Sequence, residues 1–195
     1  MEENQSFEIS KEDLGEFPIA KYEGEIVIVN DAASLKAFLN EGIEKEDVIG
    51  FDTESKPSFK RGEQNKMALI QMATKSKVYL IRVSKIGYPP ALCNFIKRLP
   101  GTVVGIGLDD DWRELRRAGV NIKPKHVVDL NEFAKEKGFK SIGAKKLSAL
   151  LLGFNISKKQ QISNWENDEL TEAQINYAAT DAWICRDIYF KLIGI

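Results

Sequence analysis

Cysteine and histidine are scarce in this sequence of 195 residues, and their scarcity excludes several kinds of site. The two cysteines, Cys93 and Cys185, both lie in apolar helical contexts, which fits a reducing interior better than a disulfide framework. One histidine and two cysteines cannot make up a Cys/His zinc site. A hydrolase with a Ser-His-Asp or Cys-His arrangement would depend on His126 alone, which we interpret as structural or exposed.

Long apolar runs are also absent. None approaches the ~18 residues that span a bilayer, so we expect no membrane association. The opening MEENQSFEIS is acidic and polar, unlike a secretory signal or an Arg-rich transit peptide. With 43% hydrophobic and 29% charged residues, the chain has the composition of a globular domain rather than a disordered one. We therefore expect a cytoplasmic protein, or a nuclear one in a eukaryote.

Charge is unevenly distributed along the chain, although the net charge is only −1. Residues 1–49 contain 13 acidic and 4 basic side chains, whereas residues 50–195 contain 16 acidic and 24 basic ones. A positive body of this kind favours a polyanionic ligand. A solvated surface of mixed sign explains the same counts, so charge alone leaves both interpretations open.

Hydrophobic periodicity and turn residues divide the chain into an acidic polar lead-in, residues 1–23, and a single domain, residues 24–195. Strands are expected at 24–30, 48–53, 67–73, 78–83, 102–108 and 127–130. Helices are expected at 31–39, 91–98, 130–137, 143–152 and 171–192, and one more follows the strand at 102–108 and ends at about residue 117. Three early strands joined without helices, then strand–helix–strand–helix, predict an α/β fold with an antiparallel meander in a mixed sheet.

The segment GFDTES contains two carboxylates with the spacing of a strand. Asp52 and Glu54 are two residues apart, so both side chains project from one face of the strand while Thr53 points the other way. Repulsion between the two acids would be relieved by a hard divalent cation, Mg²⁺ or Mn²⁺, which takes oxygen ligands. The alternative is a strand end at which water hydrates both acids.

Two further groups of polar residues follow. Tyr177 precedes Asp181 by four residues in YAATD, so the phenol and the carboxylate share one face of a helix, although a surface pair explains the same spacing. Asp109, Asp110 and Asp111 follow the strand TVVGIGL. One of these acids is expected to cap the next helix, and another could reach the first pair of acids.

The segments FDTES, VGIGLDDDW and SNWENDELTEAQINYAATDA, in this order, resemble the three motifs of the DEDD superfamily of exonucleases. The tyrosine at position 177 is similar to that of the tyrosine-bearing branch, and the sequence looks most like Werner-type exonuclease domains and, less closely, ribonuclease D. The resemblance covers about residues 24–193. Each motif is short, but all three in order, with MALIQMA after the first, are specific.

The resemblance implies a ribonuclease H-like fold with flanking helices and a two-metal mechanism that uses Mg²⁺ or Mn²⁺. It implies that Asp52 bridges both ions, that Glu54 and Asp181 hold the ion that activates water, and that Asp111 supports the second ion. Tyr177 would orient the attacking water. Two ions ~4 Å apart supply an activated water and stabilise the leaving oxygen, so no histidine base is needed.

Substrate contacts are implied less sharply. By resemblance, backbone groups near Ser55 would meet the terminal nucleotide, and a basic residue before SNW, Lys158 or Lys159, would contact the substrate. Other basic side chains are candidates for phosphate contact, with a solvated surface as the alternative: Lys56, Lys60, Arg61, Lys66, Lys145 and Lys146. Trp112 and Trp165 could stack on a base, although packing in the core is the interpretation that we favour.

We therefore expect a metal-dependent 3′–5′ exonuclease that hydrolyses phosphodiester bonds from the 3′ end of DNA or RNA and releases nucleoside monophosphates. The alternative is a non-catalytic nucleic-acid-binding or adaptor module on the same fold. Such relatives normally lose one or more of the acids, and none is missing here. An endonuclease with similar metal chemistry is a third hypothesis.

Overall fold

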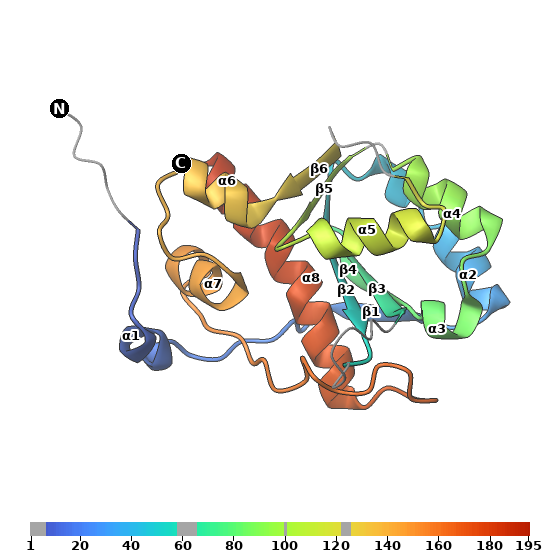
Figure 1. Cartoon of the computed structure of the whole chain (residues 1–195), viewed down its shortest axis with the longest axis horizontal. Helices are drawn as coiled ribbons and strands as arrows, with labels where there is room; N and C mark the ends of the chain where they lie inside the picture. The colour runs from blue at the N-terminus through green and yellow to red at the C-terminus, as the bar shows by residue number, and fades with distance from the viewer. Residues whose placement is uncertain (1–6, 58–65, 100, 122–125) are drawn as a thin grey trace.

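A six-stranded mixed sheet forms the centre of the structure, a computed structural model that describes residues 7–57, 66–99, 101–121 and 126–195. The strands are β1 Glu25–Val29, β2 Val48–Ser55, β3 Met67–Ala73, β4 Lys77–Ile81, β5 Thr102–Gly105 and β6 Val127–Asp129. Their order in the sheet is β1-β4-β3-β2-β5-β6 (Figure 1). Strands β2, β3 and β4 are antiparallel neighbours, whereas β1, β5 and β6 pair in parallel. The predicted meander and mixed sheet are confirmed.

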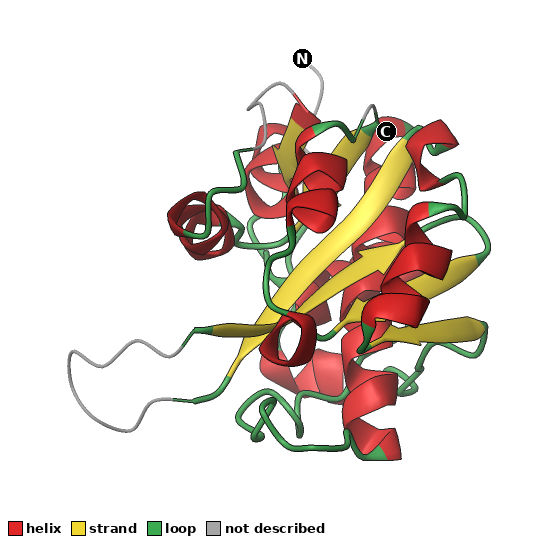
Figure 2. Ribbon diagram, turned by 90° about the vertical axis from the view of Figure 1, so that its right-hand side faces the viewer, coloured by secondary structure: helices red, strands yellow, loops and turns green. Residues whose placement is uncertain are grey.

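Helices cover both faces of the sheet (Figure 2). The helices are α1 Lys11–Glu16, α2 Ala32–Leu39, α3 Val83–Ile86, α4 Pro90–Lys97, α5 Asp109–Arg117, α6 Leu130–Glu136, α7 Ala144–Leu152 and α8 Glu172–Ile193, with a short 3-10 turn at Ile43–Lys45. Side chains of α2 to α5 bury one face of the sheet, and those of α6 to α8 bury the other. No described helix is both long and apolar enough to cross a bilayer.

Alternation along β2 decides which residues reach which layer. Ile49 and Phe51 are fully buried on the face that carries α2 to α5. Val48 belongs to the opposite layer with α6 to α8, and a period of two places Asp52 and Glu54 on that same face. Helix α8 is the long element on this face (Figure 1). The acids of β2 are therefore directed toward α8.

Two predicted strands end earlier than expected, for local reasons. The strand expected at 102–108 ends at Gly105 because Gly107 has a φ of 73°, a left-handed conformation that turns the chain out of the sheet. The strand expected at 78–83 ends at Ile81 because Val83 already begins α3. The expected helix at the C-terminal end is confirmed as α8, and Thr171 and Gln174 form its capping box.

The described part of the lead-in, residues 7–23, packs along the domain. Phe7 stacks on Phe139 with ring centroids 4.4 Å apart. Ser10 caps the short helix α1, which was not expected from the sequence. Further along, the Tyr22 amide donates a hydrogen bond of 3.0 Å to Thr180 Oγ1 on α8. This segment is therefore tied to the layer of α6 to α8.

Candidate active site

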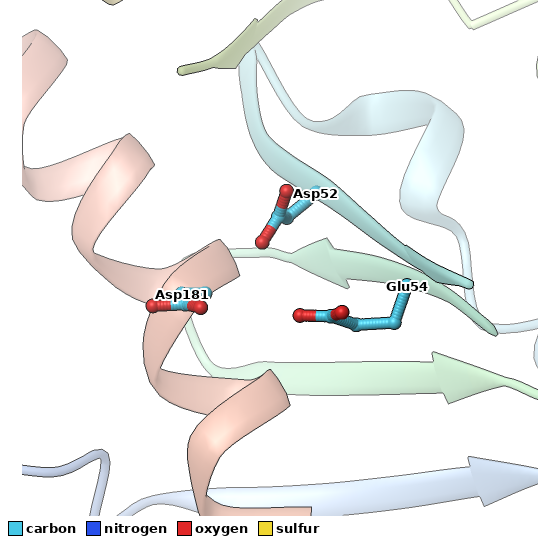
Figure 3. Close-up of side chains that lie close together, drawn as sticks. All are labelled: Asp52, Glu54 and Asp181. Carbon is cyan, nitrogen blue, oxygen red and sulfur yellow. The ribbon is translucent and has the colours of Figure 1, made fainter. Parts of the chain in front are cut away.

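Three carboxylates from β2 and α8 converge on one point. Figure 3 shows Asp52 and Glu54 projecting from β2 toward Asp181 on α8. One ligand oxygen from each residue lies within 4.8 Å of the other two. Glu54 is 9% exposed and Asp181 is 3% exposed, whereas Asp52 is partly buried. The alternative of two fully hydrated acids at a strand end therefore does not hold for Glu54, and the cation expected between Asp52 and Glu54 stays a prediction. We call these three residues the acid cluster.

The close approach of α8 to β2 depends on Gly50. A Cβ atom at this position would lie 2.1 Å from the backbone carbonyl oxygen of Ala182 and 3.1 Å from Arg186 Cβ. Gly50 is two residues before Asp52 and Ala182 directly follows Asp181, so this contact lies beside the acid cluster. The absence of a side chain at Gly50 therefore lets the helix come close enough for the carboxylates to meet.

Burial raises the pKa of all three acids, and repulsion between carboxylates also raises that of Asp52 and Glu54. Burial is the largest cause for each of them. The neighbouring carboxylates raise the pKa of Asp52 further, and that of Glu54 rises to about 10. For Asp181 the charge of Lys158 opposes the increase. A cluster that is costly to ionise on its own is a favourable place for added positive charge.

Lys158 supplies such a charge from the segment before SNW. Its Nζ atom donates hydrogen bonds of 3.0 Å and 2.9 Å to the two carboxylate oxygens of Asp181. The same atom lies 3.4 Å from the Tyr177 hydroxyl and 5.2 Å from the centre of its ring. Burial alone would lower the pKa of Lys158, but the charge and hydrogen bonds of Asp181 outweigh it and raise that pKa. Sequence spacing carried no signal for this pairing.

Tyr177 lies one turn before Asp181 on α8, as the i, i+4 spacing predicted. It is only 7% exposed, and its ring is 5.8 Å from that of the fully buried Trp165. Burial, followed by the negative charges of Asp181 and Glu54, raises the pKa of its hydroxyl. The phenol is therefore neutral and able to donate a hydrogen bond at this edge of the acid cluster.

Asp111 is near the acid cluster but is not a member of it. It lies in the first turn of α5 and accepts a hydrogen bond from the Thr53 hydroxyl, which projects from the other face of β2. Its negative charge nevertheless raises the pKa of Asp52. None of the three aspartates is the N-cap residue of α5, which is Leu108, but all three lie in its first turn, at the positive end of the helix dipole as expected. Asp110 pairs with Arg113 at 2.6 Å.

The residues expected to contact substrate lie in different places. Lys158 lines a cavity of about 310 Å³ above the acid cluster, together with Gln161, Ala144 and Cys185. Lys159 lines a neighbouring groove on the other side of Tyr177. Both cysteines are unpaired, as the sequence indicated.

The other candidate contacts that the structure describes are not among the residues that line this cavity. Ser55 ends β2 at an irregularity in its pairing with β3, and Lys56 forms an ion pair of 3.5 Å with Glu166. Lys66 lines a separate cavity, and Lys145 and Lys146 are on α7. Lys60 and Arg61 fall outside the residues that the structure describes.

Both tryptophans pack against aromatic neighbours. Trp112 stacks on Phe51 with ring centroids 4.7 Å apart, and Trp165 has no exposed surface. The favoured interpretation, packing, is confirmed for Trp165, and one face of the partly buried Trp112 ring packs in the same way.

The segment 157–170 is fastened beside the site. The guanidinium of the buried Arg82 donates hydrogen bonds to the backbone carbonyls of Asn167 and Asp168. The Gln174 side chain donates to Ser163 Oγ and to the carbonyl of Asn164, at 3.2 Å and 3.1 Å. These contacts hold the end of the segment that follows Lys158, and they were not expected from the sequence.

Comparison with known proteins identifies the class. A family model described as 3′–5′ exonuclease matches residues 26–193, so the chain belongs to this family of phosphodiester hydrolases. It is 35% identical over 187 residues to the mouse bifunctional 3′–5′ exonuclease/ATP-dependent helicase WRN, covering 90% of the chain and 13% of that protein. It is 34% identical over 148 residues to an Arabidopsis thaliana 3′–5′ exonuclease, covering 72% of the chain and 51% of that protein.

Solved structures confirm the ribonuclease H-like fold. The exonuclease domain of Aedes aegypti Nibbler superposes with a TM-score of 0.79 at 24% identity, covering 90% of this chain and 91% of that one. Escherichia coli RNase D superposes with a TM-score of 0.75 at 22% identity, covering 87% and 44%. The chain spans only part of the length of its curated relatives, about half or less of the first three.

Proposed function

We propose that this domain removes nucleotides one at a time from the 3′ end of DNA or RNA by hydrolysis assisted by two divalent cations, Mg²⁺ or Mn²⁺. The observation that carries the proposal is the convergence of Asp52, Glu54 and Asp181 in a cavity of the size of a small ligand site. The family supplies the class of reaction. The cations, the products and the roles of individual residues belong to the proposal.

The acid cluster suits hard cations. It offers carboxylate oxygens alone, which are the ligands that Mg²⁺ and Mn²⁺ prefer. Its acids have raised pKa values because they are buried close together, so a bound cation would remove the repulsion that opposes their ionisation. We assign Asp52 as the shared ligand, Glu54 and Asp181 as ligands of one ion, and Asp111 as support for the other.

When bound to these acids, cations would supply an activated water and stabilisation of the leaving oxygen. The protein's own groups then have to orient the reactants. Tyr177 carries a neutral hydroxyl beside Asp181, and we assign it to orient the attacking water by hydrogen bonding. Lys158 carries the positive charge of the same cavity, and we assign its ammonium to the phosphate of the terminal nucleotide.

Support for the nucleic-acid substrate is indirect. The relatives are called exonucleases, and one solved structure that this chain resembles, Trypanosoma brucei RNase D, is a complex with RNA U12 (TM-score 0.76, 17% identity). Most of the positive charge of this chain lies in residues 50–195, where the site is. Carboxylates that would hold cations, with Lys158 in the same cavity, fit a polyanionic strand.

The test uses 5′-labelled single-stranded DNA, recessed duplex DNA and RNA, each with Mg²⁺ or Mn²⁺ and with or without chelator. We expect a chelator-sensitive ladder that shortens from the 3′ end. Asp52→Asn should abolish it, whereas Asp110→Asn, an exposed acid of the same size, should not. Internal fragments would indicate an endonuclease. Binding without any cleavage would indicate a non-catalytic module.

A further inference from the structure

Gln71 is a buried amide whose polar atoms have no partner. It lies in the middle of β3 and has 0% exposure. Neither its Oε1 nor its Nε2 atom forms a hydrogen bond with any described residue. Buried polar side chains in native proteins are nearly always hydrogen-bonded, so an amide without a partner requires an explanation.

The sheet places Gln71 beside the acid cluster. In the antiparallel pairing of β2 with β3, Gln71 is directly opposite Asp52. Directly opposite residues point to the same face, with Cβ atoms roughly 5 Å apart, and Glu54 is the diagonal neighbour of Gln71 on that face. On the other side Gln71 is opposite Leu80, which is apolar and fully buried. The polar groups nearest to the amide along the sheet are thus the acids of β2.

Among the described residues, Asp52 and Glu54 are the acids of this site without a side-chain donor, and Asp52 is the one directly opposite Gln71. Asp181 accepts hydrogen bonds from Lys158, and Asp111 accepts one from Thr53. Among the described residues, no side chain donates a hydrogen bond to Asp52. An ionised carboxylate can only accept hydrogen bonds, and a carboxylate that holds a cation keeps lone pairs that need a donor.

We propose that Gln71 is a positioning residue for Asp52: its Nε2 group donates a hydrogen bond to the Asp52 carboxylate when that carboxylate holds a cation, and so fixes which oxygens face the cation. This inference rests on the proposed function, since it concerns the same site. A hydrogen bond from a neighbouring residue to a metal-binding side chain typically changes metal affinity by about 10- to 100-fold.

The test compares Gln71→Met with Met72→Leu. Methionine is close to glutamine in length and removes the donor, whereas Met72 is the next residue on β3, equally buried but on the other face. Two quantities are measured for each: the Tm in the presence of chelator, and the Kd of Mn²⁺ by calorimetry without nucleic acid. Gln71→Leu serves as a second variant if the methionine variant does not fold.

For Gln71→Met we expect an unchanged or higher Tm, because an unpartnered polar group has been removed from the core. We also expect Mn²⁺ to bind about 10-fold more weakly. Met72→Leu should leave the Kd unchanged. A residue that only packs would behave in the opposite way, with a lower Tm and an unaltered Kd, and that result overturns the inference.

A failure of the proposed function is distinguishable from a failure of this inference. If the wild-type protein does not bind Mn²⁺, or if Asp52→Asn binds it as well as the wild type does, the metal site itself is wrong. If Asp52→Asn loses the ion while Gln71→Met keeps wild-type affinity, only the role of Gln71 is wrong. Activity gives an independent readout. Gln71→Met should raise the Mn²⁺ concentration that gives half-maximal activity, and it should change kcat at saturating Mn²⁺ by a smaller factor.

Discussion

The ammonium of Lys158 holds both carboxylate oxygens of Asp181, at 3.0 Å and 2.9 Å. The lysine side chain is 27% exposed, whereas the Asp181 side chain is 4% exposed. The lysine ammonium thus occupies the oxygens that a divalent cation would use. Because the two positive charges repel one another and share acceptors, filling the site requires Lys158 to release at least one of these oxygens.

Lys158→Met should therefore tighten Mn²⁺ binding severalfold, measured by calorimetry. If Lys158 also contacts the terminal phosphate, the KM for nucleic acid should rise about tenfold, the loss expected for one charge-assisted hydrogen bond. Lys159→Met, the exposed neighbour outside the cavity, is the matched control and should change neither quantity. Weaker Mn²⁺ binding in Lys158→Met would show that the lysine supports the metal site rather than competing for it.

Gly50→Ala should disrupt the site by moving α8. The added methyl would meet the carbonyl of Ala182 at 2.1 Å, and backbone cannot give way as a flexible side chain can. We expect the free energy of unfolding to fall by about 2 kcal/mol or more, the upper range for overpacking, and Mn²⁺ affinity to fall with it.

Gly15→Ala is the control for the same chemical change. A Cβ atom there meets nothing within 4 Å, and the residue lies inside α1, where alanine is preferred to glycine by roughly 0.5–1 kcal/mol. Urea unfolding and calorimetry compare the two variants. A Gly50→Ala protein with wild-type stability and affinity would contradict the close contact.

The raised pKa values predict how stability without metal depends on pH. The pKa of Glu54 is about 10 in the folded protein, above its ordinary value of 4.5. Between those values the folded state binds more protons than the unfolded state, so the free energy of unfolding falls as pH rises. The slope is at most about 1.4 kcal/mol per pH unit for each proton. Thermal unfolding in chelator from pH 5.5 to 8.5 measures it.

Glu54→Gln should reduce this slope, because an amide does not titrate. Mn²⁺ should also reduce it in the wild-type protein, since protons and cations compete for the same oxygens, and Mn²⁺ affinity should accordingly rise with pH. A wild-type slope that the substitution leaves unchanged would place the responsible group elsewhere.

Periodicity within single elements accounts for what the sequence predicted correctly. A period of two placed Asp52 and Glu54 on one face of β2, and one helical turn placed Tyr177 beside Asp181. The strands of the meander were recognised because each is a short apolar run between turn residues. These relationships are local, so one segment of sequence contains all the information that they need.

The contacts that complete the site join segments far apart in the chain, and the sequence did not predict them. Lys158 pairs with Asp181 across 23 positions, and Thr53 donates a hydrogen bond to Asp111 across 58 positions. The parallel pairing of β1 with β4 was missed for the same reason. Roles of individual site residues in catalysis stay predictions.

Arg82 should stabilise the segment that follows Lys158. Its buried guanidinium donates to two backbone carbonyls, and an Arg82→Met variant would leave both without their charged donor. We expect about 2–4 kcal/mol of destabilisation and faster amide hydrogen exchange in residues 160–170. Lys85→Met removes an exposed ion pair to the same Asp168 and should cost much less, because solvent screens the pair. Equal effects of the two variants would contradict this assignment.

The contact at Gly50 has a consequence for the tolerance of the domain to change. Because main chain meets main chain there, the span between the carboxylates of β2 and of α8 is set by two backbones and not by interchangeable side chains. Hydrophobic substitutions in the layer of α2 to α5, on the far face of the sheet, can then alter stability while leaving that span unaltered. The core on that face can therefore vary in sequence while the carboxylates of the site keep their spacing.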